Sequence, residues 1–387
     1  MRKARTAIVG LGSTPYYKRG RSLPRTLDEM IGSAILAAVA DAGLSARDID
    51  GFAYYSGGFD TPLLMETLGI PTLNFSAMLT GAGGGSAGVI GLAEAAILSG
   101  QAEVVVCVGG TQQAGKRFGA YTKDADLTPV NAFHMSAGMF GPGHMFAVLA
   151  SRHMHRFGTT REHFAEVACT IRANALTHPD ALIRTPLTVD DYFAAPMIAD
   201  PLCLYDFCLE SDGAIAVIVT STERARDLRQ KPVPVLGCVH GGSRDWGRSL
   251  YAMTMPEDDF VSSGNVAIAE RLYRLTGLVP ADIDTAQFYD HFTPMVIAQL
   301  EDFGFCPRGE GGPLVASGAI RQGGSLPVNT DGGQLSGAYI WGMSHIREGV
   351  EQMRGTAANQ VPDARTVLVT GGPSNLPNSA LILGAAA

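Results

Sequence analysis

Continuous apolar runs alternate along this chain with longer segments built mainly from small apolar residues. Residues 104–108 and 367–369 contain no polar position, a pattern typical of strands buried on both faces of a sheet. Residues 34–42 and 87–98 are longer and rich in alanine, which predicts helices that pack closely against sheets. Residues 6–12 predict a first strand. The pattern therefore indicates an α/β protein.

The order of these predicted elements repeats between the two halves of the chain. In the first half, a helical segment at 31–42 is followed by a Gly-Leu pair, an Asp-Ile-Asp triplet and a strand at 51–55. In the second half, a helical segment at 266–276 is followed by the same pair and triplet, at the same spacing, and by a strand at 285–290. An internal repeat of this kind predicts two similar structural units.

Later segments continue the repeat. A glycine-rich turn and a helix at 83–99 and at 333–353 lead to strands at 102–110 and 364–372, and closing strands follow at 212–219 and 378–384. Each half is thus predicted to run strand, helix, strand, helix, strand and closing strand. We expect an N-terminal half at 1–232 and a C-terminal half at 233–387. The first half also holds an insertion at about 111–205, with a helix near 161–176, which we expect to cover the substrate.

Composition and charge narrow the class of protein. Hydrophobic residues make up 46% of the 387 residues, which is enough for a large core. The formal net charge of −8 and the absence of a long basic run argue against a nucleic-acid partner. No run of about 18 apolar residues predicts a membrane span. Six scattered cysteines and no signal-peptide core favour a cytoplasmic, reduced protein without a structural metal site.

Glycine is the compositional outlier, with 47 residues, and many lie in clusters such as those at 83–85, 332–333 and 371–372. Glycine clusters beside apolar runs predict tight turns, helix starts and close approach of the backbone to a ligand. Most of these clusters fall at matching junctions of the two halves. The glycine excess therefore marks the turns of the repeated unit.

The duplicated pattern with a large first-half insertion resembles the thiolase superfamily. The resemblance covers essentially the whole chain and is carried by residues 210–216, by Tyr289-Asp290-His291-Phe292, by 328–333 and by the turn that ends at Gly337. It is closest to the sterol-carrier thiolases and their non-thiolytic relatives. This resemblance implies a thiolase fold, with two βαβαβ-type halves in an α-β-α-β-α arrangement of layers.

The departures from a thiolase concern its catalytic groups. A thiolase places a nucleophilic cysteine at the start of its first buried helix, where the helix dipole lowers the thiol pKa. Here that turn, residues 80–86, contains no cysteine, and its last residue, Ser86, has no adjacent base motif. Where sterol-carrier thiolases have His-Asp-Cys-Phe, this chain has Tyr289-Asp290-His291-Phe292, and a Gly-His-Pro motif becomes Gly337-Ala338-Tyr339. The second catalytic cysteine, expected near 370–371, is also missing.

This replacement of thiolytic groups by proton-transfer groups resembles the lipid-transfer-protein-type aldolases of bacterial steroid side-chain degradation. The resemblance implies retro-aldol cleavage of a β-hydroxyacyl-CoA, such as a 17-hydroxy steroid-20-carboxyl-CoA, to a ketone and a short acyl-CoA such as propionyl-CoA. It implies Tyr289 and Tyr339 as the catalytic pair. No bound cofactor is expected, since CoA is part of the substrate. The expected partner is an OB-fold domain of a MaoC-like hydratase subunit, joined to a homodimer of this chain in a heterotetramer.

The residues suggest how such a site would work. A tyrosine has an ordinary pKa near ~10, so it must be stabilised as a phenolate to act as a base near neutral pH. If the strand continues past Tyr289, then His291 shares its face and could hydrogen-bond to a phenolate or stabilise its charge. Asp290 would point away and orient the turn. Backbone N–H groups near Gly337 and Tyr339 could hold the thioester oxygen. Which tyrosine is the base and which the acid is left open.

Two further residues and two alternatives complete the expectations. Arg244 and Trp246 are candidates for contacts with the phosphate and adenine of CoA, although ordinary loop roles are the commoner reading of such residues. One alternative is a thiolase with an atypical nucleophile. The other is a non-catalytic subunit that binds lipid or acyl-CoA on a degenerate thiolase fold.

Overall fold

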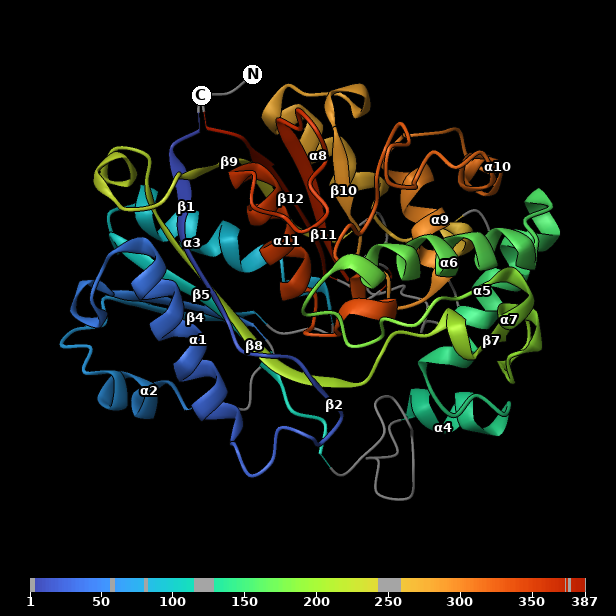
Figure 1. The fold of residues 1–387 in the computed structure, drawn as a ribbon, viewed down its shortest axis with the longest axis horizontal. Helices are drawn as coiled ribbons and strands as arrows, with labels where there is room; N and C mark the ends of the chain where they lie inside the picture. Colours follow the sequence, from blue (N-terminus) through green and yellow to red (C-terminus); the bar gives the residue numbers. More distant parts are fainter. Residues whose placement is uncertain are drawn as a thin grey trace.

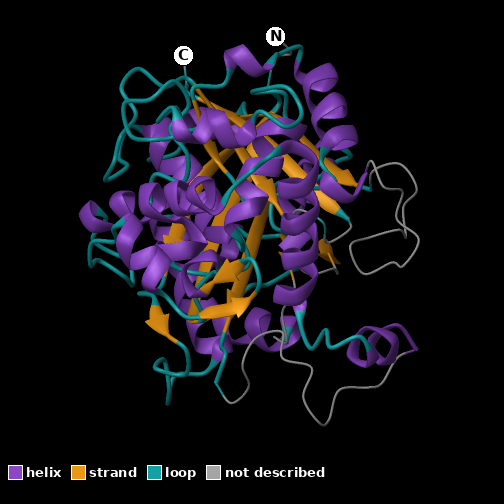
Figure 2. Ribbon diagram, turned by 90° about the vertical axis from the view of Figure 1, so that its right-hand side faces the viewer, coloured by secondary structure: helices purple, strands orange, loops and turns teal. Residues whose placement is uncertain are grey.

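The computed structural model describes residues 4–55, 60–79, 83–114, 129–242, 259–372, 374 and 377–386. Within this part of the chain no helix is long and apolar enough to cross a membrane. Figure 1 shows the N-terminus and the C-terminus side by side at one edge of the molecule. Figure 2 shows the strands largely surrounded by helices, as expected for an α/β protein.

The repeat predicted from the sequence is present in the structure as two sets of elements. The first half contains β1 (Thr6–Ser13), α1 (Leu27–Ala42), β3 (Gly51–Tyr55), α3 (Gly88–Leu98), β5 (Val104–Thr111) and β8 (Ser211–Ser221). The second half contains β9 (Val233–Gly241), α8 (Val266–Thr276), β10 (Thr285–Gln287), α11 (Met343–Arg354), β11 (Thr366–Gly371) and β12 (Asn378–Gly384). Short elements β2 (Tyr17–Lys18), α2 (Thr61–Leu68) and β4 (Phe75–Leu79) add to the first set.

The strands of both sets follow the same order. In the first half, β3 pairs parallel with β5, and β8 then pairs antiparallel with β5 and with β1. In the second half, β10 pairs parallel with β11, and β12 then pairs antiparallel with β11 and with β9. The two sets join through a short antiparallel contact between β1 and β9. The structure therefore repeats in strand order and direction as well as in sequence.

Helices separate the two sets of strands into layers. Helix α1 packs on β1, β5 and β8, while α8 packs on β9 and β12 from the outer side of the second half. Helices α3 and α11 each contact strands of both halves, and Figure 1 shows them between the two sets of strands. The apolar cores follow these layers, because one cluster of buried side chains lies under α1 and another surrounds α3 and α11. The predicted α-β-α-β-α thiolase fold is confirmed.

Local sequence explains why the outer helix α1 begins and ends where it does. Thr26 and Glu29 form a capping box, in which each side chain accepts a hydrogen bond from the backbone N–H of the other residue. The helix ends at Gly43, whose φ of 74° is left-handed and suits glycine. Because both signals are local, the predicted helix was correct in place, although it starts four residues earlier than its apolar pattern.

The insertion between β5 and β8 forms mainly helices. It contains α4 (Pro129–Ser136), α5 (Pro142–Phe157), α6 (Arg161–Thr177), α7 (Val189–Ala194) and the short strands β6 (Met197–Ala199) and β7 (Leu202–Cys203). Although it belongs to the first half in sequence, its buried side chains share a core with α9 (Thr293–Asp302) and α10 (Gly311–Ala316) of the second half. Figure 1 shows α5 and α6 beside α9 and α10. The predicted helix near 161–176 corresponds to α6.

One predicted strand is shorter than expected. The sequence predicted a strand from 285 to 290, but β10 ends at Gln287. The following residues leave the sheet because Asn329 takes over the backbone hydrogen bonds of Phe288, as donor and as acceptor. This exit places Tyr289 inside the molecule rather than along the edge of the sheet. The proposed division of the chain at residue 232 stays a prediction.

Candidate active site

The two predicted tyrosines follow different elements of the second half and meet inside the protein. Tyr289 follows β10, and Tyr339 follows η7 (Gly333–Gly337), a single π-helical turn. Their hydroxyl oxygens lie 3.0 Å apart, and their rings meet edge to face with centroids separated by 6.3 Å. Each side chain is only 1% exposed. The structure therefore brings the pair together in a buried place where a proton can pass directly between the hydroxyls.

The backbone of Tyr289 is fixed from several directions. Its N–H donates to Oγ1 of Thr370 at 2.9 Å, and its carbonyl oxygen accepts from Nε2 of Gln299 at 3.2 Å. Immediately before it, the N–H of Phe288 donates to Oδ1 of Asn329 at 2.7 Å, and Nδ2 of Asn329 donates to the carbonyl of Phe288 at 2.9 Å. These bonds come from β11, α9 and the segment before η7. The phenol of Tyr289 is thus carried by a backbone with little freedom to move.

The backbone of Tyr339 is held by hydrogen bonds to Ser211, the first residue of β8. Its N–H donates to Oγ of Ser211 at 2.7 Å, and that hydroxyl donates back to the carbonyl of Tyr339 at 3.0 Å. Burial raises the pKa of the Tyr339 phenol well above its ordinary value, and the nearness of Tyr289 and Cys208 raises it further. Tyr339 therefore stays protonated at neutral pH and is suited to donate a proton or a hydrogen bond.

His291 lies beside Tyr289, but not in the way that the strand geometry predicted. Its ring meets the edge of the Tyr289 ring at 5.1 Å between centroids and packs against Phe146 of α5 and Phe292. Burial lowers the pKa of His291 to about 3, which outweighs the opposing effect of Asp290. Neither ring nitrogen has a hydrogen-bond partner in the described part of the chain. A neutral imidazole does not stabilise a phenolate by charge, so the geometry favours packing for His291, and its predicted catalytic role stays a prediction.

Asp290 supports the turn that carries Tyr339. It is fully buried, and its carboxylate accepts hydrogen bonds from the N–H groups of Gln334 at 2.9 Å and Leu335 at 3.3 Å. Nε2 of His345, from α11, lies 3.2 Å from the same carboxylate. The carboxylate of Asp290 is thus directed toward η7. These contacts agree with an orienting role for Asp290, which stays a prediction.

The backbone around Gly337 is already occupied. The N–H of Gly337 donates to the carbonyl of Gly332 at 2.8 Å, and the Gly337 carbonyl accepts from the N–H of Leu182 at 2.9 Å. The other N–H groups from 333 to 339 also donate within the protein, to acceptors on Asp331, Asp290, Gly332, Gly333 and Ser211. The predicted use of these N–H groups to hold a thioester oxygen is therefore not supported, because each already donates to the protein.

Arg244 and Trp246, the candidates for CoA contacts, lie outside the described residues. Nothing in the structure bears on that assignment.

Comparison with known proteins decides the family. The chain is 40% identical over 393 residues to a 17-hydroxy-3-oxo-4-pregnene-20-carboxyl-CoA lyase of Mycobacterium tuberculosis, covering 99% of this chain and 100% of that protein. It is 39% identical to a steroid side-chain-cleaving aldolase of Thermomonospora curvata, covering 98% and 97% of the two chains. The family model for thiolase C-terminal domain-like sequences matches residues 248–384. The chain belongs to the thiolase superfamily.

A solved structure described as Ltp2-ChsH2(DUF35) aldolase agrees with this placement. It superposes on this chain with a TM-score of 0.91 at 38% identity, covering 99% of this chain and 98% of that one. The match places the chain with the side-chain-cleaving aldolases within the sterol-carrier and lipid-transfer-protein branch. The resemblance inferred from the motif Tyr289-Asp290-His291-Phe292 is confirmed.

The thiols of this thiolase-fold protein are unsuited to act as nucleophiles. Burial raises the pKa of every one of the six cysteines, to about 11 for Cys169 and to about 12 for Cys238 and Cys306. The attacking species in a thiolase is the thiolate, which a raised pKa suppresses. The alternative of a thiolase with an atypical cysteine is therefore disfavoured on physical grounds as well as by position.

The sequence did not single out a third buried tyrosine at this site. Tyr55, the last residue of β3, is fully buried and meets the ring of Trp341 edge to face at 6.2 Å, while Trp341 packs on Tyr339 at 5.4 Å. Burial raises the pKa of Tyr55 well above its ordinary value, and Tyr289 contributes to the shift. The only signal in the sequence was its position at the end of a predicted strand, where a tyrosine is usually a packing residue.

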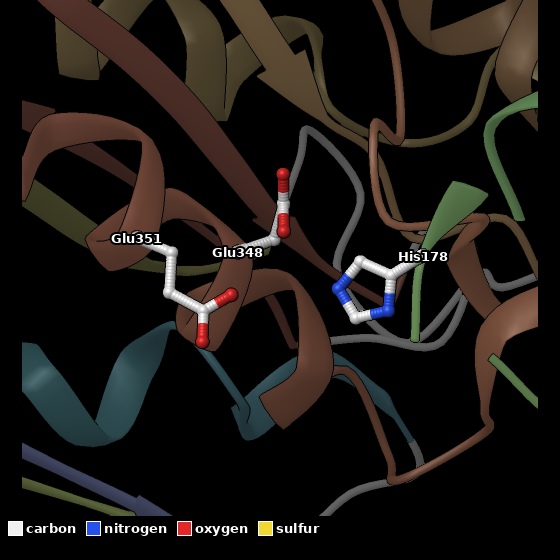
Figure 3. A group of neighbouring side chains, drawn as sticks. All are labelled: His178, Glu348 and Glu351. Carbon is white, nitrogen blue, oxygen red and sulfur yellow. The ribbon is translucent and has the colours of Figure 1, made fainter. Parts of the chain in front are cut away.

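One group of side chains in the described residues has the composition of a metal site. Single ligand atoms of His178, Glu348 and Glu351 all lie within 4.8 Å of one another, and Figure 3 shows the imidazole facing the two carboxylates. However, Nδ1 of His178 accepts a hydrogen bond from the N–H of Asp180 at 3.3 Å, so a neutral ring carries its proton on the other nitrogen. Glu351 also forms a salt bridge with Arg347, with 2.9 Å between Nε of Arg347 and Oε1 of Glu351. These contacts fit a histidine–carboxylate cluster better than a metal centre.

Proposed function

We propose that this chain is a carbon–carbon lyase that cleaves a β-hydroxyacyl-CoA by a retro-aldol reaction. The observation that carries the proposal is the 3.0 Å contact between the buried hydroxyls of Tyr289 and Tyr339, in a chain 40% identical over its length to a lyase of a CoA-linked steroid. The substrate is a 17-hydroxy steroid with a 20-carboxyl-CoA side chain, the class named for that relative. The products are the steroid 17-ketone and propionyl-CoA.

The reaction transfers one proton from oxygen to carbon. The 17-hydroxyl loses its proton, the C17–C20 bond breaks, and its electrons form the enolate of the thioester, which is then protonated at C20. The pair can carry this proton without a free phenolate: Tyr289 accepts it from the alcohol, Tyr289 passes its own proton to Tyr339 across 3.0 Å, and Tyr339 protonates C20. The raised pKa of Tyr339 supports its role as the proton donor.

This mechanism explains the missing nucleophile and the neutral histidine together. No covalent intermediate forms, so the reaction does not need the nucleophilic cysteine that a thiolase has at the turn now occupied by glycines 83–85. A concerted relay also removes the need for a charged group beside Tyr289, which agrees with the lowered pKa of His291. His291 then acts as a packing partner that holds the phenol ring from its edge. No bound cofactor takes part, since CoA belongs to the substrate.

The test is to replace each phenol by a phenyl ring. Tyr289→Phe and Tyr339→Phe are each expected to lower kcat by about 100- to 10,000-fold, because each removes one proton-transfer group. Tyr273→Phe is the matched control, since that hydroxyl bonds to the carbonyl of Phe303 at the end of α9. The assay follows ketone and propionyl-CoA from the 17-hydroxy steroid acyl-CoA. Near-normal cleavage by both variants would disprove the mechanism, and tight binding without any turnover would favour a non-catalytic subunit.

We further propose that the chain works with a separate DUF35-type partner of OB fold, carried by a MaoC-like hydratase subunit. The support is its likeness to the solved structure described as Ltp2-ChsH2(DUF35) aldolase. A homodimer of this chain with two partner chains is the proposed assembly, and a cytoplasmic location agrees with six free cysteines. Native mass spectrometry of the purified complex tests the stoichiometry, and a mass for the chain alone in the partner's presence would contradict it.

A further inference from the structure

The space beside Gly83 is filled by the phenol of Tyr289. A Cβ atom built on Gly83 would lie 2.0 Å from Cζ and 2.1 Å from the hydroxyl oxygen of Tyr289. Gly83 is not one of the glycines with a left-handed φ, so its backbone could be adopted by alanine. The tyrosine of the second half is therefore the reason why this position of the first half must lack a side chain.

The Cδ2–Cε2 edge of the same ring lies against Gly342. A Cβ atom there would lie 2.9 Å from Cδ2 and Cε2 of Tyr289 and 2.7 Å from Oγ of Ser86. Gly342 also has a φ of 85°, which by itself favours glycine. Gly83 and Gly342 thus both lie directly against the phenol ring and leave room for it by having no side chain. Gly83 is the more informative of the two, because the three atoms nearest to a Cβ there all belong to Tyr289 and its φ is not left-handed.

Neither the turn at Gly83 nor the backbone of Tyr289 can easily move away from the other. The carbonyl of Gly83 accepts a hydrogen bond from Oγ of Ser86 at 3.2 Å, and a Cβ on Gly371 would lie 3.2 Å from that same carbonyl. A Cβ on Gly372 would lie 2.1 Å from the N–H nitrogen of Gly84, so β11 packs directly behind the turn. On the other side, the backbone of Tyr289 is fixed by Thr370. A side chain at position 83 must therefore move the phenol itself.

We propose that Gly83 is a positioning residue: its missing side chain sets the Tyr289 hydroxyl at hydrogen-bond distance from Tyr339. This inference rests on the proposed function, because it assigns Gly83 a part in the same proton relay. It follows that one point in the site holds either a side chain on residue 83 or the Tyr289 phenol, but not both. The glycine is a condition for tyrosine chemistry at this place.

The kinetic test uses a double-mutant cycle. Gly83→Ala is expected to lower kcat about as much as Tyr289→Phe, by at least 100-fold, with KM changed only a few-fold. The double variant Gly83→Ala/Tyr289→Phe is expected to be no slower than Tyr289→Phe, since the phenol has already been lost. Gly32→Ala is the matched control, because its Cβ would meet only Leu64 and Leu68, at 3.9 Å. A normal kcat for Gly83→Ala, or effects that multiply, would overturn the inference.

A stability measurement separates this inference from the proposed function. Gly83→Ala is expected to lower the denaturation midpoint strongly in the wild-type background, but only slightly in the Tyr289→Ala background, where the ring is gone. If Gly83→Ala does not fold, then Gly83→Ala/Tyr289→Ala is expected to fold. Equal losses in both backgrounds, or a double variant that does not fold, refute the contact. A wild-type enzyme without lyase activity would instead refute the proposed function, while this cycle still decides the steric claim.

Discussion

Two glycine-rich turns occupy corresponding places in the two halves, yet glycine serves a different purpose in each. The first-half turn, Gly83–Gly85 followed by Ser86, leads into α3, and the second-half turn, Gly332 followed by Gly333–Gly337, precedes α11. In the first-half turn, Cβ atoms at positions 83 and 85 would enter the rings of Tyr289 and Tyr55. These glycines are needed because side chains from other segments occupy their space.

In the second-half turn the requirement lies in the backbone and in one carboxylate. Gly332 and Gly333 have φ values of 94° and 54°, in the left-handed region. A Cβ on Gly333 would also lie 2.1 Å from Oδ2 of Asp290, which accepts the N–H groups that follow in the turn. One turn therefore makes room for a catalytic group, while the other is a rigid support for Tyr339. Composition alone cannot distinguish these two uses of glycine.

The largest effect on stability is expected from removing the support of the second-half turn. Asp290→Ala leaves the buried N–H groups of Gln334 and Leu335 without an acceptor, which should lower the free energy of unfolding by about 3–5 kcal/mol. Asp290→Asn keeps one acceptor oxygen and should lose less. Chemical denaturation followed by circular dichroism measures both. A loss below about 1 kcal/mol for the alanine variant would show that the turn does not depend on this carboxylate.

A smaller effect is expected from Gly333→Ala, which tests the backbone and the carboxylate together. A left-handed φ costs an alanine about 1–2 kcal/mol, and the clash with Asp290 should bring the total loss in unfolding free energy to about 2–4 kcal/mol. Gly69→Ala is the matched control, because it has a φ of 69° and nothing within 4 Å of its Cβ. Equal losses in the two variants would mean that Asp290 adds nothing to the requirement for glycine.

The fold was largely predictable because its signals are local and occur twice. The helix at 266–276 and the strand at 378–384 have the predicted bounds. Local residues mark these ends, since Gly277 follows the helix, Pro377 precedes the strand and Gly384 is its last residue. The strand at 285–290 was predicted too long because its end is set by Asn329, more than 40 residues away. A contact so distant leaves no trace in the local pattern.

The site was predictable where the family motif identified a residue, and less so where its role depended on surroundings. The meeting of Tyr289 and Tyr339 followed from the motif. The neutrality of His291 did not, because it results from burial against Phe146 of the insertion, which the sequence could not place. The full use of the N–H groups around Gly337 also required the structure, since Asp290 and Ser211 supply two of the acceptors.

The smallest effect on the free energy of unfolding, per pH unit, is expected from the ionisation of Glu348 in α11, the helix that follows the second-half turn. Burial raises its pKa from 4.5 to about 8, and the nearby charges of Asp331 and Glu351 add to the shift. Thr330 donates to the same carboxyl group at 2.5 Å. Between pH 4.5 and 8 the folded protein therefore keeps a proton that the unfolded chain has lost. Stability must fall as pH rises through this range, by about 1.4 kcal/mol per pH unit.

Glu348→Gln should flatten this dependence, because an amide exchanges no proton. The comparison is made between pH 6.5 and 8, above the range in which the lowered pKa of His291 makes stability rise with pH. Wild-type protein should lose unfolding free energy steadily over this interval, while the variant should change little. Parallel curves for the two proteins would show that Glu348 is already ionised in the folded state. In that case protonation of Glu348 would contribute nothing to the stability of the second-half turn, which, like the first-half turn, would depend on packing and hydrogen bonds.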